Sequence, residues 1–277
     1  MTKSLWIAVV AVALSGTCHA ADVQTPDPHW SDCVFAPTAT TADSCNAIIQ
    51  GGQETGVTLA KAYFYRGHAY DLGSKYDIAI ADYTQALQLN PDPSRSAGLF
   101  EYRGAAYANE KDYSHALTDL DRSIQLNTQS AISYLVRGQT HEAMKDYAAA
   151  LADFDRAIAL KPGDAEYLNA RCWVRTLDEQ LDGARADCDA ALAAQPGYEP
   201  ALDSRGLLNL KLGRFQDAWN DYDAAVRTSP KGTSWMYGRG VAAMRLGRTA
   251  EGQADLAAAA KLYPTIAESY AGYGIAP

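Results

Sequence analysis

The sequence has few of the residue patterns that catalysis, metal binding or nucleic-acid binding requires. It contains no Gly-x-Ser-x-Gly, no glycine-rich phosphate loop and no His-Glu-x-x-His, and its five cysteines include no Cys-x-x-Cys pair. A formal net charge of −9 disfavours binding to nucleic acid and to anionic lipid surfaces. We therefore expect no enzymatic activity, no cofactor, no metal and no nucleic-acid partner. The histidines beyond the N-terminal segment share no common spacing: His29, His68, His115 and His141.

Long apolar runs are also missing, except at the N-terminus. Lys3 precedes the stretch LWIAVVAVAL, and SGTCHA then ends in the small residue Ala20, which is the layout of a secretory signal peptide. Ten apolar residues do not span a bilayer, which takes about 20. We expect a signal peptide over residues 1–20 and an exported protein, periplasmic or secreted, without a transmembrane segment. The alternative is a lipoprotein acylated on Cys18, although LSGTC carries one residue too many before the cysteine.

What the sequence does contain is internal repetition, which decides the fold class. Between recurring anchor residues, two helix-length segments with apolar residues at i, i+3, i+4 and i+7 flank a short polar break. A proline closes most repeats and ends their second helix. Since one helix pair cannot bury its own apolar face, the pairs must stack on one another. The anchors follow at one spacing of 37 and then five of 34: Gly67, Gly104, Gly138, Cys172, Gly206, Gly240 and Gly274.

The repeated unit resembles the tetratricopeptide repeat. Motifs such as YFYRGHAY and FEYRGAAY place an aromatic residue before the anchor glycine and a tyrosine after it, and alanines and a proline follow later in the unit. The resemblance implies an all-α fold, a right-handed α-solenoid of about six helix pairs with N- and C-terminal capping helices. Residues 21–59 are expected to form a loop and a capping helix, and 267–277 a C-terminal cap. The six units are expected at 60–93, 97–130, 131–164, 165–198, 199–232 and 233–266.

Two cysteines replace a recurring residue pair in the fourth unit. In the other units a bulky apolar residue follows the anchor glycine sixteen positions later, and only the fourth unit has Cys172 and Cys188 instead. The tetratricopeptide resemblance places these two positions opposite each other across the helix pair, as a disulfide requires. A redox pair or a metal site would need tighter cysteine spacing. We expect a disulfide between Cys172 and Cys188 and, by subtraction, a second between Cys33 and Cys45.

An arginine and an aspartate also recur in every unit. The arginine directly precedes the anchor, and the aspartate directly precedes the bulky position sixteen residues further on. We expect a structural ladder of bidentate Arg–Asp pairs between helices, within or between neighbouring units. The alternative is a row of arginines that binds an anion. The ladder comprises Arg66, Arg103, Arg137, Arg171, Arg205, Arg239, Asp82, Asp119, Asp153, Asp187, Asp221 and Asp255.

Tetratricopeptide arrays are typically protein-binding scaffolds whose first helices line a concave groove. The subfamily that binds acidic chaperone tails has lysines and asparagines there, whereas the matching positions here hold Phe64, His68, Glu101 and Tyr102. The resemblance therefore implies a protein or peptide partner of different, unidentified chemistry. The alternative is that some of these residues pack against adjacent helices or against the C-terminal cap. Helical spacing predicts these groove residues: Phe64, His68, Leu135, Gln139, Asn169, Trp173, Leu177, Leu207, Leu210, Tyr237, Val241 and Met244.

Together these patterns predict a non-enzymatic protein–protein interaction scaffold or adaptor of the cell envelope. It would hold a partner segment in its groove, with Trp173 and Tyr237 as the main anchors. The alternative is an architectural or self-associating envelope protein, lipid-anchored if Cys18 is acylated.

Overall fold

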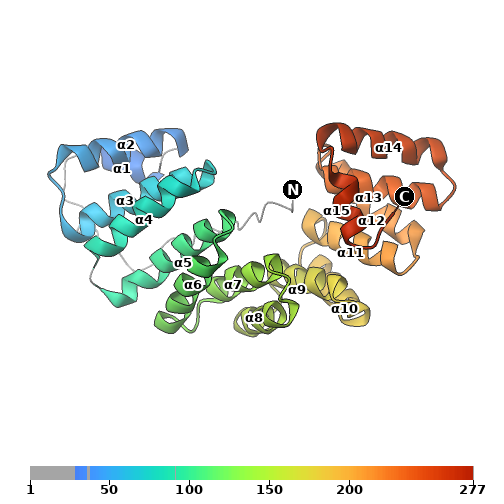
Figure 1. The fold of residues 1–277 in the computed structure, drawn as a ribbon, viewed down its shortest axis with the longest axis horizontal. Coiled ribbons are helices and arrows are strands. Elements are labelled where there is room, and N and C mark those ends of the chain that lie inside the picture. The colour runs from blue at the N-terminus through green and yellow to red at the C-terminus, as the bar shows by residue number, and fades with distance from the viewer. Residues whose placement is uncertain (1–28, 36–37, 91, 277) are drawn as a thin grey trace. The chain divides into compact units, whose positions relative to one another are not determined.

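A computed structural model describes residues 29–35, 38–90 and 92–276, and within them the chain forms fifteen α-helices and no strands. The chain divides into two compact units whose boundary falls between Thr140 and His141. The predicted signal peptide over residues 1–20 lies outside the described residues. Figure 1 labels the helices in chain order. The prediction of an all-α fold built from consecutive helix pairs is confirmed.

The N-terminal unit consists of consecutive helices, each packed on the next as far as α6. Its inner positions are small or aromatic: Ala79, Tyr83, Tyr102 and Ala106 form one buried cluster between neighbouring pairs. Its helices are α1 (His29–Phe35), α2 (Thr38–Gly51), α3 (Gly56–Leu72), α4 (Tyr76–Leu89), α5 (Pro93–Asn109) and α6 (Tyr113–Leu126). Helix α7 (Ala131–Ala143) contains the boundary between the two units.

The C-terminal unit continues the pattern. Each helix from α8 to α14 packs on the next, and the first helices α9, α11 and α13 also contact one another in sequence. Its helices are α8 (Tyr147–Leu160), α9 (Ala165–Leu177), α10 (Leu181–Ala194), α11 (Glu199–Lys211), α12 (Phe215–Thr228), α13 (Thr233–Arg245), α14 (Thr249–Leu262) and α15 (Ile266–Gly272).

A three-residue turn joins the two helices in each of the six pairs. The middle residue of every turn has a positive φ, the left-handed conformation that reverses the chain at a helix end. Two of these residues are glycines, and four are residues that pay a steric cost there. The second helix begins two residues after this middle residue in every pair. Asp112 and Asp146 cap helices α6 and α8 by accepting hydrogen bonds from backbone N–H groups. The middle residues are Ser74, Lys111, Lys145, Glu179, Gly213 and Gly247.

The anchor glycines let the two helices of a pair approach closely. A Cβ added to Gly206 would lie 2.7 Å from the ring of Tyr222, and one added to Gly104 would lie 2.9 Å from Leu120. No real side chain tolerates such contacts without a shift of its neighbours. The repeated glycine is therefore a packing requirement of the crossing between first and second helix.

The N-terminal segment differs from the expected loop and single capping helix. Residues His29–Phe35 form helix α1, and α2 already begins at Thr38. The reason is tertiary contact: Cys33 is fully buried with Cys45 and Ile48, and the Trp30 indole N–H donates to Glu54 at 3.1 Å. These contacts stabilise a short helix in a stretch whose proline and threonine content favours loops.

The C-terminal cap is a short helix followed by a further turn of chain. Helix α15 packs against α13 and α14, beside which it is drawn in Figure 1. Beyond it, the amide N–H of Ile275 donates to the carbonyl of Tyr270 at 2.9 Å. Ile266, Tyr270 and Ile275 are all buried, so this C-terminal segment (residues 266–276) contributes to the core of its unit.

Candidate functional site

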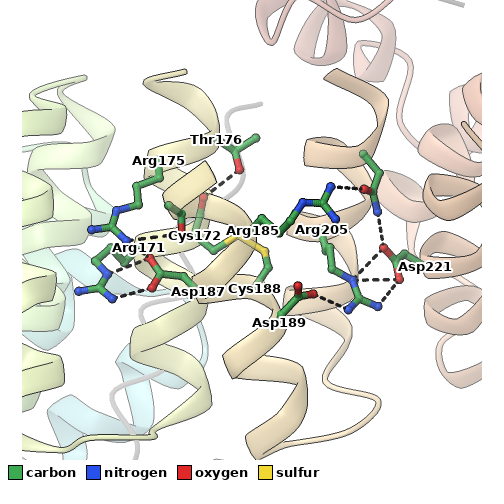
Figure 2. Close-up of a disulfide and its surroundings, with 12 residues drawn as sticks. Arg171, Cys172, Arg175, Thr176, Arg185, Asp187, Cys188, Asp189, Arg205 and Asp221 are labelled. Atoms are coloured by element: carbon green, nitrogen blue, oxygen red, sulfur yellow. Dashed lines mark hydrogen bonds and ion pairs between the residues drawn. A yellow bond between two sulfur atoms is a disulfide. The ribbon is translucent and has the colours of Figure 1, made fainter. Parts of the chain in front are cut away.

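Five of the six recurring arginines form ion pairs with the aspartate of their own helix pair. Arg171 shows the geometry in Figure 2: its Nε and Nη2 atoms donate to the two carboxylate oxygens of Asp187 at 2.8 and 2.5 Å. Arg103 does the same with Asp119, at 2.7 and 2.8 Å. The remaining paired arginines are Arg66, Arg205 and Arg239, with Asp82, Asp221 and Asp255. Arg137 and Asp153 belong to different units, and that rung stays a prediction.

A second set of four aspartates, missed in the sequence, connects each of the last four helix pairs to the one before it. The Nη1 atom of Arg171 donates to Asp155 at 2.7 Å, and that of Arg205 donates to Asp189 at 2.8 Å. Arg137 binds Asp121 and Arg239 binds Asp223 in the same way. The sequence signal was available: the second helices read DLD, DFD, DCD and DYD, with two aspartates two residues apart. Each such arginine therefore bridges neighbouring repeats.

The two aspartates differ in exposure at Arg171 and Arg205, but not at Arg239. The side chain of Asp221 is 7% exposed and that of Asp189 is 52% exposed, although both bind Arg205. The hydrogen bonds that Arg171 donates to Asp187 raise the pKa of the Arg171 guanidinium further above its ordinary value, although burial opposes this shift. With their donors directed at aspartates, these guanidinium groups hold repeats together, which disfavours the alternative of an anion-binding row.

Both expected cysteine pairs lie at disulfide distance. Cys172 and Cys188 join α9 to α10 with 5.4 Å between their Cα atoms, and the bond lies beside the Arg171 pair in Figure 2. Cys33 and Cys45 join α1 to α2, with Cα atoms 4.8 Å apart. All four residues are fully buried. No group of three or more His, Cys, Asp or Glu residues in the described part of the chain could hold a metal ion.

Two predicted groove residues of the N-terminal unit, Phe64 and His68, lie in an aromatic cluster. The Phe64 ring lies 5.1 Å from Tyr102 and 6.1 Å from Tyr83, and His68 lies 5.5 Å from Tyr102. Burial lowers the pKa of His68 and raises that of Asp71 to about 6, while the Tyr83 hydroxyl partly opposes the latter by donating to Asp71 at 3.3 Å. These rings link α3, α4 and α5, so their main contacts are with neighbouring helices.

Two predicted groove residues carry buried amide oxygens. Gln139 and Asn169 are half-buried, and the Oε1 and Oδ1 atoms of their side chains have no hydrogen-bond partner among the described residues. Leu135, on the same helix as Gln139, is buried. Leu177, one turn beyond Trp173, is half-buried. A buried unpaired acceptor is costly, and a donor from a bound segment would relieve that cost.

Most of the predicted groove residues of the C-terminal unit are buried rather than open to solvent. We call Trp173, Leu210, Tyr237 and Val241 the apolar face; each is at most 7% exposed, and Leu207 lies beside Leu210 on α11. The C-terminal segment contacts this face. The Met244 side chain packs against α14 instead, since a Cβ on Gly252 of α14 would lie 2.7 Å from the Cγ atom of Met244.

The contacts of the C-terminal segment are aromatic. The Tyr273 ring lies edge-on to Trp173 with 5.3 Å between centroids, and the Tyr270 ring lies 4.7 Å from that of Tyr237. The Tyr270 hydroxyl donates to the carbonyl of Ser234 at 2.8 Å. Burial raises the pKa of Tyr273 to about 12. Sequence spacing identified the receiving residues, and these contacts agree with the alternative that some of them pack against the C-terminal cap.

Among the described residues, no helix is both long and apolar enough to cross a membrane. Stacked helix pairs, a glycine at all but the fourth crossing and a repeating ion-pair ladder define a helical repeat protein. Family models described as "Tetratricopeptide repeat" match residues 60–93, 135–199 and 204–274. The chain therefore belongs to the tetratricopeptide repeat family, whose members are in general protein-interaction scaffolds rather than enzymes.

Solved structures share the fold at low sequence identity. A tetratricopeptide repeat protein from Parabacteroides merdae has a TM-score of 0.70 at 15% identity, covering 89% of this chain and 96% of that one. PilW, described as a widely conserved type IV pilus biogenesis factor, has a TM-score of 0.65 at 20% identity, covering 74% and 94%. YrrB, described as a TPR protein with an unusual peptide-binding site, has a TM-score of 0.51 at 19% identity, covering 72% and 98%. The comparison with curated proteins found no match.

Proposed function

We propose that this chain is an exported adaptor that binds a segment of a partner protein on the inner side of its first helices. The observation that supports the proposal is the apolar face: Trp173, Leu210, Tyr237 and Val241 come from three successive first helices, and a peptide-sized segment, residues 266–276, contacts them. Aromatic anchors of this kind dominate binding energy at protein interfaces. The fold neighbour YrrB, described as having a peptide-binding site, supports the same mode of recognition.

Export is the second part of the proposal. The sequence layout of residues 1–20 and two buried cysteine pairs at disulfide distance both support it, because disulfides persist in oxidising compartments. The intact mass of the protein purified from its host tests this part. A mature chain that begins at Ala21 and has no free thiols is expected; an unprocessed chain or an acylated Cys18 would contradict it.

Photo-crosslinking in the host compartment tests the binding mode. A photoreactive residue at position 177, on α9 next to Trp173, should form adducts with one partner protein. Position 224, an exposed residue of α12, serves as the matched control and should give none. Equal adducts from both positions, or no adduct from position 177, would contradict binding on the first helices.

A further inference from the structure

We infer that the apolar face is a receptor for a short helical segment with two aromatic side chains three positions apart and an aliphatic one shortly after them. Residues 266–276 are its tethered occupant, and a partner segment of the same chemistry displaces them. This inference rests on the proposed function and specifies the kind of segment that binds.

The seated segment supplies the template. Its two tyrosines lie three positions apart, so they project from nearly the same side of one helical turn. Tyr270 enters between α13 and α12: its hydroxyl donates to the Ser234 carbonyl at 2.8 Å and lies 3.4 Å from the Tyr222 hydroxyl. Tyr273 reaches back to Trp173 on α9. Ile275 follows as the aliphatic member and is 9% exposed.

The resident segment does not fill the site on the apolar face completely, and we call this site, the apolar face with the residues that line it, the seat. An open cavity of about 430 Å³ remains beside the segment, lined by Leu210, Val241 and Phe215 on the receptor side and by Tyr273 and Ile275 on the occupant side. This cavity is open to solvent, and Glu179, Lys211 and Arg245 contribute polar lining beside the apolar residues. A partner with bulkier side chains at these positions would therefore bury more apolar surface than the resident segment does.

Polar groups at the two ends of the seat specify its orientation. At one end Asp203 accepts from the Ser234 hydroxyl at 3.1 Å. Burial raises the pKa of the Tyr270 hydroxyl, and the nearby negative charge of Asp203 raises it further. At the other end Arg245 donates to the carbonyl of Ala276 at 3.0 Å, and Lys211 also lines the cavity. The seat thus fits a segment whose first aromatic residue carries a hydroxyl donor and whose backbone offers an oxygen acceptor after its aliphatic residue.

The segment is held by few contacts beyond these side chains. Helix α15 has seven residues, which is too short to be stable alone. After α15, the backbone N–H groups of Tyr273, Gly274 and Ile275 each donate one hydrogen bond to a carbonyl of the preceding turn. A flexibly tethered occupant acts at an effective concentration on the order of mM, which weakens any competing segment without preventing its entry.

A synthetic peptide of residues 264–276 with a fluorescent label tests the inference by anisotropy. In the intact chain the resident segment competes with it, whereas the double variant Tyr270→Ala, Tyr273→Ala has a weakened occupant. We expect the peptide to bind the double variant at least tenfold more tightly than the intact chain. Adding Trp173→Ala should abolish that binding, and the matched control Trp219→Ala, on the outer helix α12, should leave it unchanged.

A second measurement on the intact chain keeps the test decisive if the double variant loses its fold. The amide hydrogens of Tyr273, Gly274 and Ile275 should exchange at least 100-fold faster than those of α13, because the segment opens locally. Exchange in step with α13 would overturn the inference, as would a folded double variant that does not bind the peptide. A dimer that the peptide dissociates would also overturn it, because a second copy would then supply the occupant.

These outcomes are independent of the crosslinking experiment. The peptide assay uses purified chain and a defined probe, so its failure would leave a partner bound elsewhere on the first helices. Conversely, absence of a crosslinked partner in the host would leave the peptide result standing and would count only against the adaptor function.

Discussion

The ring of Tyr273 lies edge-on against the indole of Trp173, with 5.3 Å between the ring centroids. The two residues belong to the last turn of the described chain and to α9, with two complete helix pairs between them in sequence. The Trp173 indole N–H in turn donates to Glu142 at 2.7 Å. The C-terminal segment therefore does more than cover the last helix pair: it reaches the residues that sequence spacing assigns to a binding groove.

The ladder predicts that two aspartates bound to one arginine differ in their contribution to stability. Asp221→Ala leaves Arg205 and Asn209 without a buried partner and should lower the free energy of unfolding by about 3–5 kcal/mol. The exposed Asp189 is the matched control, and Asp189→Ala should cost less than about 1 kcal/mol. Urea unfolding measures both. Equal effects would show that burial does not set the strength of this pairing.

A second prediction concerns the effect on stability of replacing glycines where helices cross. A Cβ added to Gly238 would lie 2.2 Å from the Tyr222 ring, where neighbouring repeats meet. Gly238→Ala should therefore destabilise the protein by about 1–3 kcal/mol. Gly272, in α15, has no atom within 4 Å of an added Cβ, so Gly272→Ala should leave the thermal midpoint unchanged or raise it slightly. A neutral Gly238→Ala would mean that the crossing has room to spare.

A third prediction concerns the disulfide in the fourth helix pair. The bond spans a sequence separation of 16, and its loss should reduce the free energy of unfolding by about 3 kcal/mol. The double substitution Cys172→Ala, Cys188→Ala removes both the bond and the packing. The double substitution Cys172→Gly, Cys188→Leu introduces the pair found at Gly104 and Leu120. It should recover the stability that comes from packing but not the stability that comes from the cross-link. If the double alanine variant unfolds at the wild-type urea midpoint, the cross-link is absent from the folded protein.

Asp71 predicts a pH dependence of stability. Burial raises the pKa of its carboxyl group in the folded state to about 6, against 3.8 as the ordinary value. Folding therefore favours the protonated form, so its contribution is complete below about pH 4 and is lost as the pH rises through about 6. Asp71→Asn retains an acceptor for Tyr83 and should make the variant progressively more stable than wild type over this interval. A constant difference between the two proteins from pH 4 to 7 would place the Asp71 carboxyl in water.

Local and periodic features were predictable from the sequence, and contacts between distant parts of the chain were not. The anchors, the Arg171–Asp187 type of pair and the Cys172–Cys188 bond each recur, or break a recurrence, at a fixed spacing. Helix α1 was missed because it depends on burial of Cys33, not on periodicity.

The remaining gaps have the same physical origin. The bridging aspartates, such as Asp155, occupy positions that look like ordinary solvated helix surface until the next repeat is placed beside them. The position of Tyr273 on Trp173 leaves no periodic trace, since an irregular chain end can dock on any apolar surface within its reach.

Proton–proton contacts between the Trp173 indole and the Tyr273 ring show directly whether the chain's own C-terminal segment occupies the apolar face. The indole signals are assigned by their loss in Trp173→Phe, and we expect nuclear Overhauser effects between the two rings in the dilute, monomeric protein. Their absence, with the Trp173 indole freely quenched by acrylamide, would contradict this placement of the C-terminal segment.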